Sequence, residues 1–109
     1  MIRQFKVQIC NEKWNVRLLS TKEFRERYGK GTMGITEYSH RAKPPQRDIT
    51  FQPNHKDKDT IMHEVLHAYL SYRDTSSMSY GQIEEAMCEF LPKNHHYIKR
   101  VVDNIIKKL

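Results

Sequence analysis

The chain has 109 residues, of which 38% are hydrophobic and 29% are charged, and its formal net charge is +6 at pH 7. This length suits one domain over residues 1–109 with a modest core, and the composition excludes an intrinsically disordered chain. Since no apolar stretch approaches the roughly 20 residues of a membrane-spanning helix, we expect no membrane partner.

The cysteines and the N-terminus bear on the cellular compartment. Cys10 and Cys88 lie far apart in the sequence, without the spacing of a metal or redox motif. The first ten residues lack the apolar region and the small-residue cleavage site of a secretory signal. Because structural disulfides are rare in the cytoplasm, we expect a cytoplasmic protein with reduced thiols.

Two segments near the N-terminus alternate apolar and polar residues, which predicts antiparallel strands over 4–10 and 13–20. The tripeptide Asn-Glu-Lys between the apolar runs suits a hairpin turn. A short helix is predicted from Ser20 to Gly29, because Ser20 and Glu23 have capping-box spacing and Gly29 suits a C-cap.

The remaining chain reads as two further strands followed by helices. Strands are predicted over 34–40 and 47–53, on either side of a loop with two prolines, which cannot donate ladder hydrogen bonds. Helices are predicted over 60–74, 80–91 and 94–109, with Pro92 ending or bending the second. The last helix has one apolar face, made of Ile98, Val101, Val102, Ile105, Ile106 and Leu109. The predicted fold is α+β, with a small antiparallel or mixed sheet packed on helix 60–74 and two further helices.

Helix 60–74 carries two histidines and a glutamate among apolar residues. Positions i and i+4 of a helix share one face, so His63 and His67 can direct imidazole nitrogens at one ion. Glu64 lies one step round, where its carboxylate can reach a water on that ion. This spacing is H-E-x-x-H, in which the histidines bind Zn²⁺ and the glutamate acts as general base. We also expect the stripe through His63, His67 and Ser71 to be buried, so that a metal would satisfy both imidazoles.

A catalytic zinc site needs a third protein ligand beside the two histidines. The next helix offers Glu84 and Glu85, between which its periodicity does not choose. The further candidates are Glu89, Cys88, Asp74, His95 and His96. The candidates that would stabilise a developing oxyanion are Tyr69, Tyr80, His95 and His96.

The segments "MHEVLHAYL" and "EEAMCEFL" resemble small zincin-type proteins related to the ImmA/IrrE metallopeptidases, and "YGKGTMGITEYSHRAKPPQRDITFQP" is similar to the same group. The resemblance covers about Ser20 to Leu109 and implies a minimal zincin-like peptidase domain. Through an E-A-x-x-F motif it implies Glu85 as third zinc ligand, although Phe90 stands one position late. Many members are encoded by phages or mobile elements, which implies the host cytoplasm. The family also implies that the strand "ITEYSH" or "RDITFQ" binds an extended peptide by β-addition.

The predicted function is therefore zinc-dependent hydrolysis of peptide bonds. Zinc on His63, His67 and Glu85 would activate a water, and Glu64 would pass its proton to the leaving amine. One alternative is a zincin-like binding module or inhibitor with structural zinc. Another is a DNA-associated protease of the SprT type, which the net charge suggests. Because the basic residues are scattered and no basic stripe alternates with aromatics, we expect a protein or peptide substrate or target, and we leave nucleic acid open as a second kind of partner.

Overall fold

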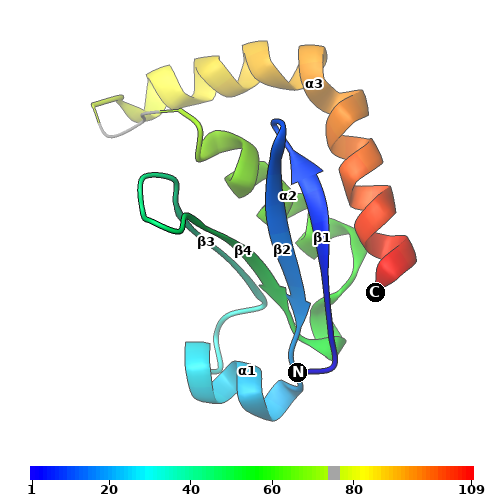
Figure 1. Cartoon of the computed structure of the whole chain (residues 1–109). Helices are drawn as coiled ribbons and strands as arrows, with labels where there is room; N and C mark the ends of the chain where they lie inside the picture. Colours follow the sequence, from blue (N-terminus) through cyan, green and yellow to red (C-terminus); the bar gives the residue numbers. More distant parts are fainter. Residues whose placement is uncertain (74–76) are drawn as a thin grey trace.

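A computed structural model describes residues 1–73 and 77–109 and contains a four-stranded sheet (Figure 1). The strands are β1 (Arg3–Ile9), β2 (Glu12–Leu18), β3 (Gly34–Ser39) and β4 (Gln46–Phe51). Their order across the sheet is β1-β2-β4-β3. β2 and β4 are parallel, whereas β1–β2 and β3–β4 are antiparallel pairs. The predicted α+β class with a mixed sheet is confirmed.

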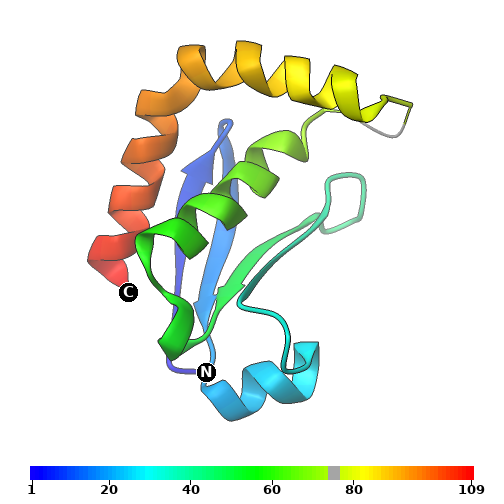
Figure 2. The ribbon, with the colours of Figure 1, turned by 180° about the vertical axis from the view of Figure 1, so that it is seen from behind.

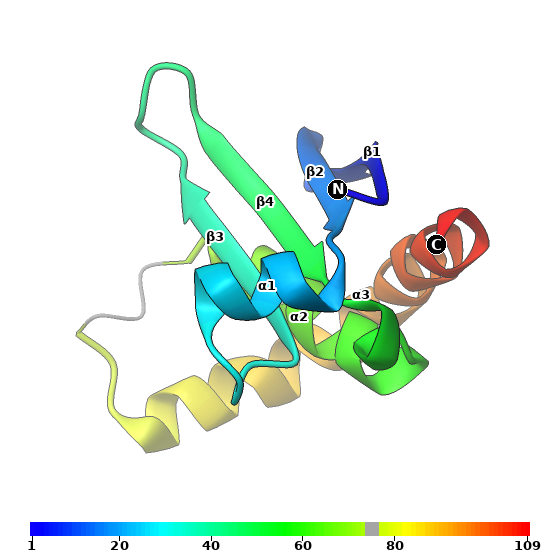
Figure 3. The same ribbon diagram turned by 90° about the horizontal axis from the view of Figure 1, so that it is seen from below.

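The described helices are α1 (Thr21–Tyr28), the 3₁₀ segment η1 (Pro53–His55), α2 (Lys58–Leu70) and α3 (Tyr80–Lys108). Seen from below, α2 and α3 lie on the same side of the sheet, which gives a two-layer arrangement (Figure 3). From behind, α2 crosses the sheet, and α3 arches around it and continues beside β1 (Figure 2). None of the helices in the described residues is long and apolar enough to span a membrane.

The N-terminal hairpin and the short helix form with small shifts from their predicted bounds. The turn is Cys10–Asn11, slightly earlier than predicted, and both residues have positive φ angles of 53° and 63°. Such angles match the twist of a two-residue hairpin. Ser20 caps α1 by accepting the Glu23 backbone N–H at 3.2 Å, and Gly29 ends it with φ of 84°. Both caps are as predicted.

Pro92 does not end a helix, because the predicted helices 80–91 and 94–109 form the continuous helix α3. This helix changes direction along its length (Figure 1). Proline lacks a backbone N–H and its ring clashes with the carbonyl four residues earlier, which bends a helix. Near this point the Asn94 side chain donates to the Phe90 carbonyl at 2.9 Å. Of the two predictions for Pro92, that it ends the helix or that it bends it, the second agrees with the shape of α3.

The core lies between the sheet and the helices, where apolar side chains of β1, β2, β4, α2 and α3 meet. The apolar face of α3 contributes its buried residues Ile98, Val101, Val102 and Ile105. Ile106 is 42% exposed, so its predicted place on this face is wrong. One residue turns a helix by about 100°, which carries Ile106 away from the sheet.

The neighbouring residues Ile105 and Ile106 provide a matched test of this packing. Ile105→Ala should lower the free energy of unfolding by about 2–5 kcal/mol, because it leaves a cavity at a fully buried side chain. Ile106→Ala should change it by less than about 1 kcal/mol. Urea denaturation followed by circular dichroism measures both, and equal losses would contradict the described packing of α3.

Candidate functional site

Helix α2 begins at a well-defined cap. The Asp57 side chain accepts the Thr60 backbone N–H at 3.1 Å and the Thr60 hydroxyl at 2.8 Å. These hydrogen bonds from Thr60 lower the pKa of Asp57 below its usual value. The helix ends at Leu70, four residues before the predicted end, and the candidate ligand Asp74 lies outside the described residues.

The imidazoles of His63 and His67 point toward each other, with their Nε2 atoms 3.1 Å apart. Two ligands of a tetrahedral zinc ion, each about 2.05 Å from the metal, lie roughly 3.3 Å apart. The pair therefore fits two ligands of one zinc ion. Both side chains are exposed, so the expectation of a buried histidine stripe is wrong. They lie on the side of α2 that faces away from the core residues Ile61 and Val65.

Glu64, unlike the histidines, is buried, with 5% of its surface exposed. The Thr36 hydroxyl on β3 lies 2.9 Å from Glu64 Oε1 and 3.0 Å from the Glu64 backbone carbonyl oxygen. A buried carboxylate is costly unless it is hydrogen-bonded, and Thr36 provides that partner. This contact holds the Glu64 carboxylate between α2 and β3. Glu64 directly follows His63 on the helix.

Gly34 allows β3 to approach Glu64 closely. A Cβ atom at this position would lie 3.1 Å from Glu64 Cγ and 3.2 Å from a ring carbon of Phe51. Both distances are shorter than ordinary van der Waals contacts. A side chain at position 34 would therefore push β3 away from α2 or displace the Glu64 side chain.

A pocket of about 460 Å³ lies beside Glu64 and His63. It is enclosed by the start of α2 and by the connection between α1 and β3, and its other lining residues are Gly31, Thr32, Met33, Gly34, Asp59 and Thr60. The buried side chain of Gln52 donates to the Thr32 carbonyl at 2.9 Å, which fixes this connection to the end of β4. The pocket therefore lies beside His63 and brings Glu64 to its wall.

The last polar residue of the stripe, Ser71, belongs to a network around His40. Arg47 Nε donates to His40 Nδ1 at 3.0 Å, so His40 Nε2 carries the proton and donates to Ser71 Oγ at 2.9 Å. The Tyr72 ring stacks on His40 with a centroid distance of 4.3 Å. Burial, together with the nearby charge of Arg47, lowers the pKa of His40. The network fixes the C-terminal end of α2 against the sheet.

A third metal ligand is not assembled at the histidine pair. In residues 1–73 and 77–109, no three His, Cys, Asp or Glu side chains form a group that could hold a metal ion. The candidates on the first half of α3 are exposed there, namely Glu84, Glu85, Cys88 and Glu89. The structure therefore does not bring Glu85 to His63 and His67, and its role as ligand stays a prediction.

The candidate oxyanion groups lie on α2 and α3. Tyr69 packs on Phe90 with a ring-centroid distance of 5.7 Å, on the side of α2 that faces α3. Tyr80 is 92% exposed at the start of α3. His95 and His96 lie on α3, where they border a surface pocket with Lys99 and Arg100. These positions do not show which of the four residues would stabilise a developing oxyanion.

No protein-family model, curated protein or solved structure matches this chain. The resemblance to the ImmA/IrrE group therefore depends on the motif residues alone.

Three residues around the site were not predicted from the sequence, namely Gly34, Thr36 and His40. Gly34 offered a signal, because a glycine within a strand often marks a close backbone approach. The sequence gives no such signal for Thr36 and His40. Their contacts are with Glu64 and Ser71, which lie 28 and 31 positions away in the sequence.

Gly34→Ala should lower the unfolding free energy by about 1–3 kcal/mol, because the new methyl group overpacks the contact between β3 and α2. Gly31→Ala is the matched control, since nothing lies within 4 Å of a Cβ built there. Thermal melts of both variants make the comparison. A Gly34→Ala protein as stable as Gly31→Ala would contradict the close approach of β3 to Glu64.

Proposed function

We propose that this chain is a zinc-dependent peptidase in which His63 and His67 hold the metal and Glu64 acts as general base. The observation that carries the proposal is the 3.1 Å approach of the two Nε2 atoms on an exposed helix face, directly beside a buried glutamate. In water, a hydrogen bond between two exposed imidazoles contributes little to the stability of the fold. A metal ion bound by both nitrogens would account for their close approach. When bound, zinc supplies a Lewis acid that polarises a carbonyl group and lowers the pKa of water.

The position of Glu64 supports its role as base. Thr36 restrains the carboxylate at 2.9 Å, and burial limits its side-chain freedom. A base held in one place beside His63 is oriented before the substrate arrives. This lowers the entropic cost of reaching the transition state. The pocket that Glu64 lines gives it access to a reacting group. Glu64 would take a proton from the attacking water and donate it to the leaving amine.

The arrangement of the sheet supports an extended peptide as substrate. In the described chain β3 is an edge strand, whereas β4 lies between β2 and β3. Of the two strands considered for β-addition, "ITEYSH" in β3 is therefore the one with a free edge. Since Thr36 on β3 contacts Glu64 on α2, a peptide added to this edge would run beside the histidine pair.

The protein should bind about one zinc ion per chain, measured by native mass spectrometry of untagged protein. His63→Ala and His67→Ala should each weaken zinc binding by at least about 100-fold, because each removes a direct ligand. Both variants should stay folded, since the side chains are exposed. His55→Ala, outside the motif, is the control and should keep its metal.

The neighbouring glutamates of α3 test the third ligand in the same assay. Glu85 is the third ligand that the family resemblance implies, so Glu85→Gln should weaken zinc binding strongly and Glu84→Gln only slightly. If both variants bind zinc as the parent does, another group completes the site. If the parent binds no zinc and stays folded, the metal-site proposal is wrong.

Glu64→Gln tests catalysis separately from binding. The amide keeps an oxygen that accepts from Thr36, so zinc content, melting temperature and peptide affinity should be retained. Turnover of a quenched fluorescent peptide library should fall about 100-fold or more, because the base is lost. Glu26→Gln, on the exposed surface of α1, serves as the matched control.

Two outcomes would contradict the enzyme proposal. Undiminished turnover in zinc-loaded Glu64→Gln would show that Glu64 is not the base. Zinc binding without turnover in the parent, with a protein target still bound by Glu64→Gln, would favour the binding-module alternative.

A further inference from the structure

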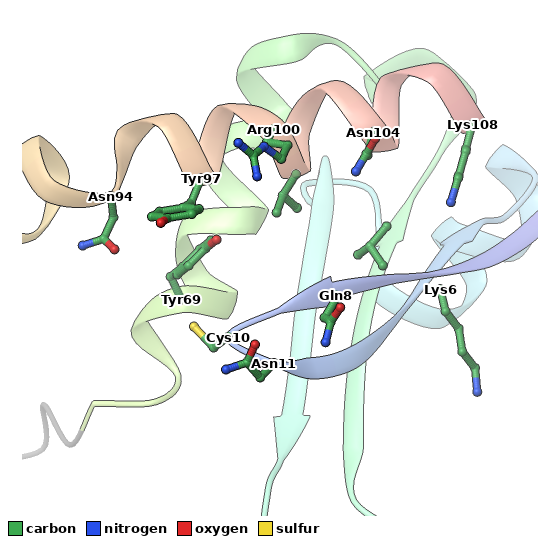
Figure 4. Close-up of a pocket in the computed structure, with 12 residues that line it drawn as sticks. Lys6, Gln8, Cys10, Asn11, Tyr69, Asn94, Tyr97, Arg100, Asn104 and Lys108 are labelled. Atoms are coloured by element: carbon green, nitrogen blue, oxygen red, sulfur yellow. The ribbon is translucent and has the colours of Figure 1, made fainter.

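A second site lies between β1 and the second half of α3, away from the histidine pair. The groove there has a volume of about 710 Å³ (Figure 4). Tyr69 of α2 lines it, whereas His67 lies about 200° round the same helix, on the opposite side. The groove shares no lining residue with the pocket beside Glu64. It is therefore a separate feature of the molecule.

The groove is positively charged. Lys6 from β1 and Arg100 and Lys108 from α3 line it, and no aspartate or glutamate does so within residues 1–73 and 77–109. Among the described side chains, the ion pairs within 4.0 Å involve none of these three cations. Residues 93–108 contain five Lys and Arg against the single acid Asp103. These charges are available to neutralise an anionic ligand.

The cations on α3 form part of a regular row. Arg100, Asn104 and Lys108 follow one another at intervals of four residues, and Figure 4 shows all three on the helix that borders the groove. Eight residues of helix span about 12 Å. A stacked nucleic-acid strand advances about 3.4 Å per nucleotide, so the row matches about three or four nucleotides. The ligand that fits is extended and carries repeated negative charge.

Aromatic and amide side chains accompany the charges. Tyr97 is 49% exposed, and the Arg100 guanidinium carbon lies 5.8 Å from its ring centroid. Tyr69 and Tyr97 lie near each other at one end of the groove in Figure 4. Four amide side chains line the rest, namely Gln8, Asn11, Asn94 and Asn104. The exposed ring of Tyr97 can stack on a base, whereas Tyr69 is largely buried beside it. Amides offer both donors and acceptors to base edges.

We propose that this groove binds single-stranded nucleic acid, with Lys6, Arg100 and Lys108 on the phosphates and Tyr97 stacked on a base. An acidic peptide would also satisfy the charges, and its backbone could pair with the amides, but its carboxylate side chains offer no flat aromatic face to stack on Tyr97. The basic residues are scattered in the sequence, but folding brings Lys6 and Lys108 from its opposite ends to one groove. The proposal does not depend on the proposed peptidase activity.

Fluorescence anisotropy with a labelled 12-nucleotide oligothymidine tests the proposal on the intact chain. We expect a Kd of about 1–100 µM at low salt, with a slope of log K against log salt concentration near −2 for three phosphate contacts. Arg100→Glu/Lys108→Glu should weaken binding by at least about 10-fold and reduce the slope to about −0.7. Lys22→Glu/Lys43→Glu changes the net charge equally outside the groove, and should retain affinity to within about three-fold.

Stacking is tested at Tyr97, which is exposed enough to be replaced without loss of the fold. Tyr97→Ala should weaken binding about five-fold or more, and Tyr97→Phe should restore it, because phenylalanine keeps the aromatic face. Circular dichroism confirms that each variant is folded. An unchanged affinity in Tyr97→Ala would overturn the proposal, and so would equal losses in the two charge-reversed double variants. Equal affinity for an oligoglutamate of the same charge would also overturn it, in favour of an acidic protein partner.

Discussion

The contact between Glu64 of α2 and Thr36 of β3 is the constraint on which the candidate site depends. Burying a carboxylate between a helix and a strand is tolerated only when the carboxylate is hydrogen-bonded, and the Thr36 hydroxyl at 2.9 Å meets that need. Gly34, two residues earlier, permits the approach because it has no side chain to collide with Glu64. Glu64, the edge strand and the pocket wall are therefore held together, and a shift of β3 would disturb all three.

Patterns within one element were predicted well from the sequence. Ser20 and Gly29 cap α1, since caps depend on local hydrogen bonds and backbone angles. The convergence of His63 and His67 follows from helix periodicity, because it needs only the five residues 63–67 of α2 to be helical. Periodicity states which residues share a face, but not whether that face is covered. Ile106 and the two histidines were placed inside for this reason, and the structure exposes all three.

Contacts between elements were not predictable in the same way. A ligand from α3 would depend on where that helix lies against α2, and this placement depends on contacts between the two helices. Such contacts are not encoded in a periodic pattern, so the spacing of Glu84 and Glu85 did not show which of them would be the ligand. The groove is missed for a related reason. Lys6 and Lys108 contribute to one charged surface only because β1 is an edge strand along which α3 packs.

Helix α2 contributes to both proposed sites, and it presents opposite sides to them. His63 and His67 lie on its exposed side near β3, whereas Tyr69 lines the groove beside β1. Between these sides α2 is buried through Ile61, Val65 and Ala68, which pack tightly in the core. A ligand in the groove would thus have no direct contact with the histidine pair. Nucleic acid bound there would leave the histidine pair unchanged and would act by holding the chain close to targets on that nucleic acid. This is the form that the DNA-associated alternative would take in this fold.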